Sequence, residues 1–181
     1  MIEFKYQDTE DKPMSTPLEI ERKYVIRMPD ISLIASHGDY TVSEIKQTYL
    51  ESPEHVTHRV RKRHYGDHTV YTETKKVRID KMSVYEDERE ISEGEYRALL
   101  SHRKSGTVTL KKTRHTFPYL GQIFEIDVYP EWGKSAILET ELKTRDTVVT
   151  FPGFIEIIAE VTGEKKYSNA SMAKEFPKEL I

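Results

Sequence analysis

Hydrophobic and polar residues alternate with a period of two along most of the chain from residue 18 onward. This period is typical of β-strands, because successive side chains of a strand point to opposite faces. Short connections between many such runs favour an antiparallel sheet that closes into a barrel. The pattern predicts strands at residues 18–28, 41–51, 55–65, 68–79, 82–91, 107–116, 121–130 and 135–143.

Turn and capping signals punctuate this pattern. The Gly-Asp pair at residues 66–67 lies between two alternating runs and predicts a hairpin turn. Ser92 is followed three residues later by Glu95, and this capping box predicts a helix that begins after Ser92. A second helix is expected within residues 166–176. The predicted fold is therefore mainly β, with a few helices outside the strands.

The chain divides into a short N-terminal segment and one larger unit. Residues 1–17 mix charges with two prolines and show no sustained period, so we expect a flexible N-terminal extension there. Residues 18–181 are long enough for a single domain with a sizeable core.

Composition excludes several classes of protein. Charged residues make up 33% of the chain, but the formal net charge is only -3, which argues against a general nucleic-acid binder. The absence of cysteine excludes disulfides and thiolate metal sites. No apolar run is long enough to span a bilayer or to act as a signal peptide. We therefore expect a cytoplasmic protein without a membrane or nucleic-acid partner.

Like charges recur two residues apart on separate predicted strands, which places each pair on one face of its strand. On the residues alone, such a face is either the wet exterior of a barrel or the lining of a binding site. Arginine and lysine pairs suit a chain of phosphates, whereas carboxylate pairs suit a hard divalent cation. The pairs include Glu19 and Glu21, Arg59 and Arg61, Glu88 and Glu90, Lys112 and Arg114, Glu125 and Asp127, and Glu139 and Glu141.

At this point the sequence resembles a known family. The segment EIERK at residues 19–23 fits the ExExK signature of the CYTH domain, the triphosphate tunnel metalloenzymes. The resemblance covers about residues 18–175, and its other segments follow in the order of the family. These are QTYL, RVR, TK, EDEREI, KKTR, FEIDV, ETEL and EVTGEKKYSN.

The resemblance implies an eight-stranded antiparallel closed barrel whose charged face points inward to form a triphosphate tunnel, with peripheral helices and a C-terminal plug helix. It also implies an enzyme that uses Mg²⁺ or Mn²⁺ to hydrolyse a triphosphate. The substrate expected from the family is inorganic tripolyphosphate, cleaved to diphosphate and phosphate. A small-molecule triphosphate is thus the expected partner, and the chain could also pair as a homodimer.

Roles are carried over from the family only onto matching positions. The expected metal ligands are Glu19, Glu21, Glu139, Glu141 and Asp127. The expected phosphate-binding residues are Lys23, Arg59, Arg61, Lys75, Lys112, Arg114 and Lys166. Lys112, Asp127 and Tyr49 are the expected catalytic residues, although Tyr49 also suits a packing role. Glu88, Glu90 and Glu125 are expected to support the cations.

Three alternatives stay open at the level of the sequence. A thiamine triphosphatase would need an aromatic platform at the tunnel mouth, for which Trp132, Tyr129 and Phe117 are available. A class IV adenylate cyclase is disfavoured because the HF signature of that branch is absent ahead of the first strand. A non-catalytic module that binds polyphosphate or nucleotides would not need four metal-binding carboxylates.

Overall fold

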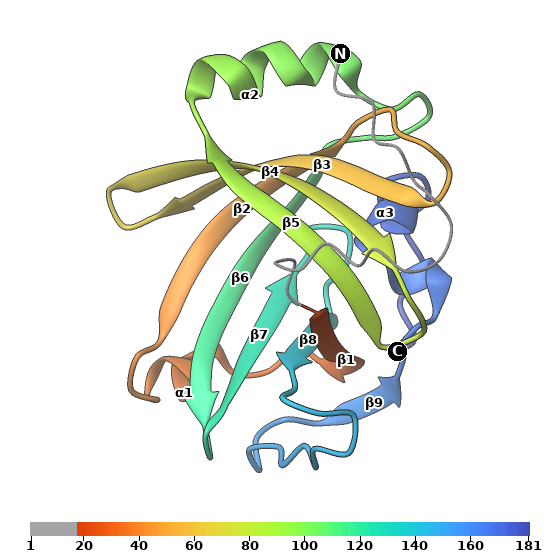
Figure 1. Ribbon diagram of the computed structural model, residues 1–181. Coiled ribbons are helices and arrows are strands. Elements are labelled where there is room, and N and C mark those ends of the chain that lie inside the picture. Colours follow the sequence, from red (N-terminus) through yellow and green to blue (C-terminus); the bar gives the residue numbers. More distant parts are fainter. Residues whose placement is uncertain (1–17) are drawn as a thin grey trace.

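The computed structural model describes residues 18–181, in which eight antiparallel strands close into a barrel (Figure 1). The strands are β1 (Leu18–Arg27), β2 (Thr41–Tyr49), β3 (Val56–Tyr65), β4 (His68–Arg78), β5 (Ser83–Ile91), β6 (Leu110–Tyr119), β7 (Gln122–Val128), β8 (Ser135–Glu141) and β9 (Ile157–Glu160). Neighbours follow the order β5-β4-β3-β2-β6-β7-β8-β1, and pairing of β1 with β5 closes the barrel. The short β9 pairs with β1 outside it. The predicted eight-stranded barrel is confirmed, whereas the expected extension at residues 1–17 lies outside the described residues.

Strand β6 begins and ends three residues later than predicted. Thr107 and Thr109 flank Val108 in a strand-like alternation, but they precede the first ladder position at Leu110. The strand continues through Pro118 because β2 stops pairing at Thr116, so no neighbour there requires the missing N–H. Its hairpin to β7 turns at residues 120–121, both with positive φ, as a tight two-residue turn requires.

The helices are short and lie outside the strands or at one mouth of the barrel. They are α1 (Ile31–Ala35), α2 (Glu93–Leu99) and α3 (Asn169–Met172), with 3-10 turns η1 (Leu100–His102) and η2 (Lys165–Tyr167). The predicted capping box of Ser92 and Glu95 is present at the start of α2. The helix expected within residues 166–176 is present in shorter form, split at Ser168, which caps α3. The sequence pattern did not predict α1 or β9, which span five and four residues.

Apolar side chains on the strands point mainly outward and are covered there. Tyr24, Phe124 and Leu138 belong to one outer cluster, which Ile34 of α1 and Ile155 cover. On the opposite side of the barrel, Val60 and Ile91 pack against Tyr96 of α2. Because neighbouring positions on a strand alternate in direction, the charged positions face the lumen.

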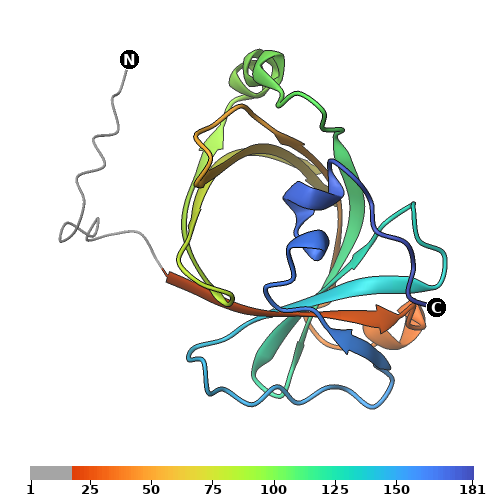
Figure 2. The same ribbon diagram turned by 90° about the vertical axis from the view of Figure 1, so that its right-hand side faces the viewer.

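One mouth of the barrel is closed by apolar packing. Figure 2 looks along the barrel and shows the C-terminal segment with α3 lying within this mouth. Val25, Leu110 and Ile137, on the lumen faces of their strands, pack with Tyr167 and Met172 of that segment. Each of these side chains is buried. The lumen is therefore closed at one end by a plug, as the resemblance implied.

Candidate active site in the barrel lumen

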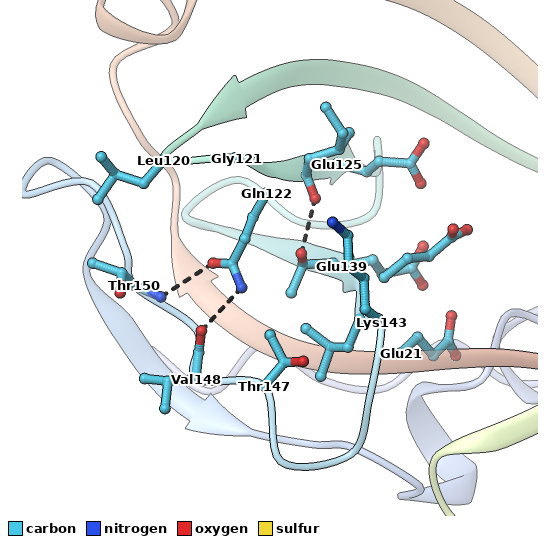
Figure 3. Close-up of a pocket in the computed structure, with 14 residues that line it drawn as sticks. Glu21, Leu120, Gly121, Gln122, Glu125, Glu139, Lys143, Thr147, Val148 and Thr150 are labelled. Atoms are coloured by element: carbon cyan, nitrogen blue, oxygen red, sulfur yellow. Dashed lines mark hydrogen bonds between the residues drawn. The ribbon is translucent and has the colours of Figure 1, made fainter.

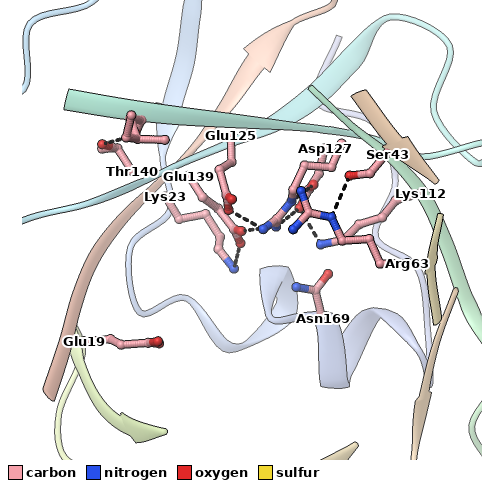
Figure 4. A network of polar contacts seen from close by, with 12 residues as sticks. Glu19, Lys23, Ser43, Arg63, Lys112, Glu125, Asp127, Glu139, Thr140 and Asn169 are labelled. Atoms are coloured by element: carbon pink, nitrogen blue, oxygen red, sulfur yellow. Dashed lines mark hydrogen bonds and ion pairs between the residues drawn. The ribbon is translucent and has the colours of Figure 1, made fainter. Parts of the chain in front are cut away.

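The inner part of the lumen holds a continuous network of ion pairs (Figure 4). Asp127 on β7 is fully buried and accepts hydrogen bonds from Lys112 at 2.5 Å and from Arg114 at 2.6 and 2.7 Å. The second guanidinium nitrogen of Arg114 also donates to Glu139 at 2.7 Å, and Lys23 reaches the other oxygen of Glu139 at 2.7 Å. Glu125 pairs with Arg114 from one side. Four strands, β1, β6, β7 and β8, thus contribute to one network.

Charge compensation decides the ionisation of this network. Burial alone would raise the pKa of Asp127 and Glu139, but the neighbouring Arg114 and Lys112, together with Lys23 for Glu139, lower both pKa values. For Lys23, burial opposes the charge, yet Glu139 raises its pKa. Burial and then Arg114 lower the pKa of Lys112 to about 8, against the pull of Asp127. Lys112 therefore titrates close to neutral pH, whereas its acidic partner stays ionised.

A second network lines the opposite wall, on β3, β4 and β5. Arg59 reaches Glu86 at 3.3 Å and Glu88 at 3.7 Å. Lys76 pairs with Glu86 and lies 3.4 Å from Glu19 on β1. Burial and Arg59 lower the pKa of Lys76 to about 8. The two walls together give the lumen cations and carboxylates from most strands of the barrel.

Arg61 differs from the cations around it. Among residues 18–181 its hydrogen bonds go to the neutral Gln47, at 3.2 and 3.4 Å, and it has no ion pair with a carboxylate. Burial, Arg59 and Arg114 lower its pKa to about 9. Its neighbour on the same face, Arg63, donates to Ser43 at 3.1 Å. Glu88 and Asp127 favour its charge only in part, so this half-buried guanidinium has the chemistry to bind a further anion.

Carboxylates gather toward the other end of the lumen, at a pocket of about 670 Å³ (Figure 3). Glu21, Glu125, Glu139 and Glu141 line it together with Lys143 and the β6–β7 hairpin. Glu21 and Glu141 lie directly opposite each other in the β1–β8 ladder. Burial raises the pKa of Glu141, and the neighbouring Glu19, Glu125 and Glu21 raise it further.

This donor set fits a hard divalent cation. Mg²⁺ and Mn²⁺ take carboxylate oxygens as ligands, and a dication would relieve the repulsion that raises the pKa of Glu141. Within residues 18–181, no three acidic or histidine side chains already converge closely enough to hold a metal. Glu19, Glu21 and Glu141 therefore supply the chemistry for such a site but are not gathered around one point.

Comparisons with known proteins identify the architecture. No protein-family model and no curated protein matches the sequence. Among solved structures, the inorganic triphosphatase NE1496 is 26% identical, with 88% of this chain and 97% of that chain covered and a TM-score of 0.55. The PH1012 and PH1819 proteins of Pyrococcus horikoshii OT3 are 24% and 21% identical, cover 71% and 67% of this chain and 80% and 78% of their own, and give TM-scores of 0.51 and 0.52. NE1496 and PH1012 are CYTH-type proteins. The chain has the fold of the CYTH family.

Within the CYTH fold, most positions taken from the resemblance share the lumen face. Register pairs Arg59 with Thr74 and Thr74 with Glu88, and it pairs Arg61 with Thr72 and Thr72 with Glu90. Alternation alone left open whether this charged face is the exterior of the barrel or the lining of its lumen. The register shows that it lines the lumen. The structure brings together Glu19, Glu21, Lys23, Arg59, Arg61, Glu88, Glu90, Lys112, Arg114, Glu125, Asp127, Glu139 and Glu141.

Two expected phosphate ligands do not lie on this face. Lys75 alternates with Tyr71 and Glu73 on the outer surface of β4, where Tyr71 packs beside α2. The lumen position belongs to Lys76, two residues after Thr74, because adjacent strand residues point to opposite faces. Lys166 is largely exposed, lies 4.8 Å from the Tyr167 ring centroid and is 3.6 Å from Glu164.

Tyr49 and Asp127 are both buried and hydrogen-bonded to neighbouring side chains, which leaves them little room to contact a substrate or a metal directly. The Tyr49 hydroxyl accepts a hydrogen bond from Gln47 at 2.6 Å, and burial raises its pKa. Three of the roughly four acceptor positions on the Asp127 carboxylate are occupied by Arg114 and Lys112. Asp127 therefore fits a role in holding those two cations better than a role as metal ligand.

Three lumen residues were missed by the sequence prediction. Glu86 and Lys76 are the partners of Arg59 and Glu19, and Arg63 extends the row of arginines on β3. The signal was present in the alternation, since residues 59, 61 and 63 are all arginine and residues 86, 88 and 90 are all glutamate. Extending each like-charged pair by one more step of two would have found Arg63 and Glu86.

The aromatic residues considered as a platform for an organic group are buried in packing. Phe117 is fully enclosed in the outer cluster, and Tyr129 and Trp132 belong to the cluster that closes the plugged mouth. The carboxylate pocket is lined by aliphatic and polar residues without an aromatic side chain. Within residues 18–181, no helix is both long and apolar enough to cross a membrane.

Proposed function

We propose that this protein hydrolyses a triphosphate bound inside the barrel, with a divalent metal as cofactor and inorganic tripolyphosphate as substrate. The observation that carries the proposal is Arg61, a half-buried guanidinium that lies among other cations and has no carboxylate ion pair within residues 18–181. A chain of phosphates supplies the missing negative charge. The likeness to the inorganic triphosphatase NE1496 points to the same class of substrate.

The arginines on β3 and β6 are suited to the phosphate chain. The planar guanidinium binds two phosphate oxygens at once, and a row of such groups recognises a chain rather than a single phosphate. Arg59 and Arg61 lie on one wall and Arg114 on the other, so a chain between them is held from two sides. Lys23, Lys76 and Lys112 add compact charges along the same space.

Glu19, Glu21, Glu139 and Glu141 are the residues that would hold Mg²⁺ or Mn²⁺. A metal there would supply Lewis-acid charge at the phosphate oxygens. Glu139 already pairs with Lys23 and Arg114, so its orientation is fixed without metal.

The remaining chemistry belongs to the side chains themselves. Phosphoryl transfer has a loose transition state, so a protein accelerates it mainly by in-line positioning and by offsetting developing charge. Lys112, with a pKa of about 8, can hold a proton on its Nζ for the leaving phosphate oxygen. Asp127 keeps Lys112 and Arg114 in place through hydrogen bonds to both. Tyr49, close to Gln47 and Arg61, is a structural neighbour of this site.

The burial of Trp132, Tyr129 and Phe117 favours tripolyphosphate over thiamine triphosphate. A thiazole or pyrimidine ring needs an aromatic surface to stack on, and these three side chains offer none at the open end of the lumen. A substrate made only of phosphates does not need such a surface.

A phosphate-release panel tests the proposal. The full-length protein is assayed with tripolyphosphate, thiamine triphosphate and ATP, each with Mg²⁺, with Mn²⁺ and with excess chelator. We expect metal-dependent release of one phosphate per tripolyphosphate, with diphosphate as the second product, and slower release from the organic substrates. Release from thiamine triphosphate that exceeds release from tripolyphosphate contradicts the choice of substrate. No release from any of the three contradicts hydrolysis.

A further inference from the structure

The plug of the barrel carries a polar side chain, that of Asn169, close to the lumen. Asn169 is the first residue of α3, and its side-chain oxygen accepts a hydrogen bond from the Tyr129 hydroxyl at 2.6 Å. Figure 4 shows the Asn169 amide pointing from α3 toward the network around Lys112 and Glu139. The apolar plug therefore carries a hydrogen-bonding group at the closed end of the proposed substrate site.

Tyr129 fixes the orientation of this amide. The Tyr129 ring is 1% exposed and packs between Trp132 and Phe176, with centroids at 6.2 and 5.3 Å. Burial, followed by the nearby Asp127 and Glu139, raises the pKa of Tyr129 well above its usual range. The phenol thus keeps its proton at neutral pH and acts as a donor. The amide oxygen of Asn169 is its acceptor, so the amide nitrogen is left to face elsewhere.

Tyr129, the partner of this amide, lies beside Lys112 in the lumen network. The Tyr129 ring centroid lies 5.8 Å from the Lys112 nitrogen, and Arg114 and Glu139 are close enough to change the pKa of the Tyr129 hydroxyl. Asn169 Nδ2 makes no hydrogen bond to another described residue, and it is not among the buried polar atoms that lack a partner. It is therefore a free donor that is not fully buried.

We propose that Asn169 binds an oxygen of the substrate phosphate nearest the plug through Nδ2, and that Tyr129 is the positioning residue that holds the amide for this contact. The inference rests on the proposed function, because it requires a phosphate chain in the lumen. A neutral amide suits this place, since it can donate to a phosphate oxygen without adding charge to the network of Lys112, Arg114 and Asp127.

Two substitutions of Asn169 separate this role from a structural one. Asn169→Asp keeps an oxygen for Tyr129 but replaces the donor with a carboxylate that repels phosphate. Asn169→Ala removes both. If the amide binds substrate, Asp is worse than Ala, and Ala lowers kcat/KM for tripolyphosphate by about tenfold to a hundredfold, chiefly through KM. If the amide only supports the plug, Asp is better than Ala in both melting temperature and kcat/KM.

Tyr129→Phe tests the positioning step. The change keeps the packed ring and removes the hydroxyl, so the amide is free to rotate. We expect a loss of several-fold in kcat/KM in the wild-type background and no further loss in the Asn169→Ala background, because the hydroxyl would then have nothing to orient. Equal losses in both backgrounds would mean that Tyr129 acts independently of Asn169.

A spectroscopic readout does not depend on turnover. Asn169 is the only asparagine in the sequence, so side-chain ¹⁵N-labelling of asparagine gives one NH₂ pair in an NMR spectrum. Tripolyphosphate added without metal should shift this pair, and Lys174→Ala, an exposed change beyond α3, should leave the shift unaltered. Failure of the wild type to release phosphate overturns the proposed function. With wild-type release established, an unmoved NH₂ pair and near-wild-type kinetics of both Asn169 variants overturn this inference alone.

Discussion

Glu21 lies directly opposite Glu141 in the β1–β8 ladder, with both side chains on the lumen face. Like charges in directly opposed positions destabilise a sheet. Glu19 and Glu125 add to this charge, and the pKa of Glu141 is raised in consequence, after the effect of burial. These carboxylates therefore repel one another, and a bound cation would relieve that repulsion.

Glu141→Gln should separate stability from function. Removing one of two opposed charges is expected to raise the melting temperature of the metal-free protein by about 2 °C, from roughly 0.5–1 kcal/mol of relieved repulsion. The same change removes a negatively charged carboxylate ligand that a hard cation prefers, so turnover of tripolyphosphate should fall by about a hundredfold. Thermal melts with and without Mg²⁺, together with phosphate release, measure both effects.

Glu44→Gln is the matched control for this substitution, since Glu44 is exposed on the outer face of β2. It should change neither the melting temperature nor turnover appreciably. Wild-type turnover of Glu141→Gln at saturating Mg²⁺ would remove Glu141 from the metal site.

Binding of tripolyphosphate should raise the melting temperature of the protein, and this rise should depend on Arg61. Tripolyphosphate at about a hundred times its Kd would stabilise the folded protein by about 2.7 kcal/mol. We expect a clear rise in melting temperature with tripolyphosphate and almost none with monophosphate, because the site is built for a chain. Arg61→Gln should abolish most of this rise without destabilising the ligand-free protein, since it removes a half-buried charge that has no carboxylate ion pair in the described chain.

Arg97→Gln, an exposed arginine of α2, is the control for this experiment. It should keep the full response to tripolyphosphate. Equal shifts from monophosphate and tripolyphosphate would argue against a site for a phosphate chain.

Most of the fold could be predicted from the sequence because alternation and turn residues are local signals. The capping box at Ser92 and the turn at residues 66–67 depend only on neighbouring residues. Alternation does not say which face points into a barrel, because closure is a property of all strands together. That choice came from the family resemblance and is confirmed by the outward packing of residues such as Val60 and Phe124.

Site residues were predicted less well where a shift of one position along a strand decides whether a side chain faces the lumen or the exterior. Thr74 and Lys75 were taken together from a motif, although adjacent strand residues cannot share a face. Lys166 was assigned by its place in a motif, but its direction depends on how the plug folds back, which no strand period encodes. Asn169 ends the segment EVTGEKKYSN, but no role could be assigned to it, since its contact with Tyr129 joins residues 40 positions apart.

Lys75 and Lys76 form a matched pair for testing the register of β4. Lys76→Met removes a lumen charge close to Glu19 and Glu86, and we expect kcat/KM for tripolyphosphate to fall by about tenfold or more. Lys75→Met changes the outer face and should leave kcat/KM within about twofold. Steady-state kinetics at excess Mg²⁺ compares the two variants directly. The reverse order would mean that the motif position, and not the strand face, identifies the phosphate ligand.

The lowered pKa of Lys112 predicts how the activity should depend on pH. Burial and Arg114 depress its pKa from about 10.5 to about 8 in the folded protein, so Lys112 is charged below pH 8 and loses its proton as the pH rises through that value. A neutral amine neither attracts phosphate nor supplies a proton to the leaving oxygen. We therefore expect kcat/KM to be level below pH 7.5 and to fall above pH 8, and Lys76, also with a pKa of about 8, would steepen the fall.

Substitution and calorimetry together attribute this fall to Lys112. Lys112→Arg keeps its charge at all these pH values, so it should flatten the alkaline fall while lowering the plateau of kcat, because arginine does not release a proton. Bound tripolyphosphate would raise the pKa of Lys112, so binding at pH 8.5 should take up protons, seen as a heat that differs between buffers of different ionisation enthalpy. Proton uptake that persists undiminished in Lys112→Arg, or a kcat/KM profile of the wild type that stays level to pH 9.5, would show that Lys112 does not titrate in the working range.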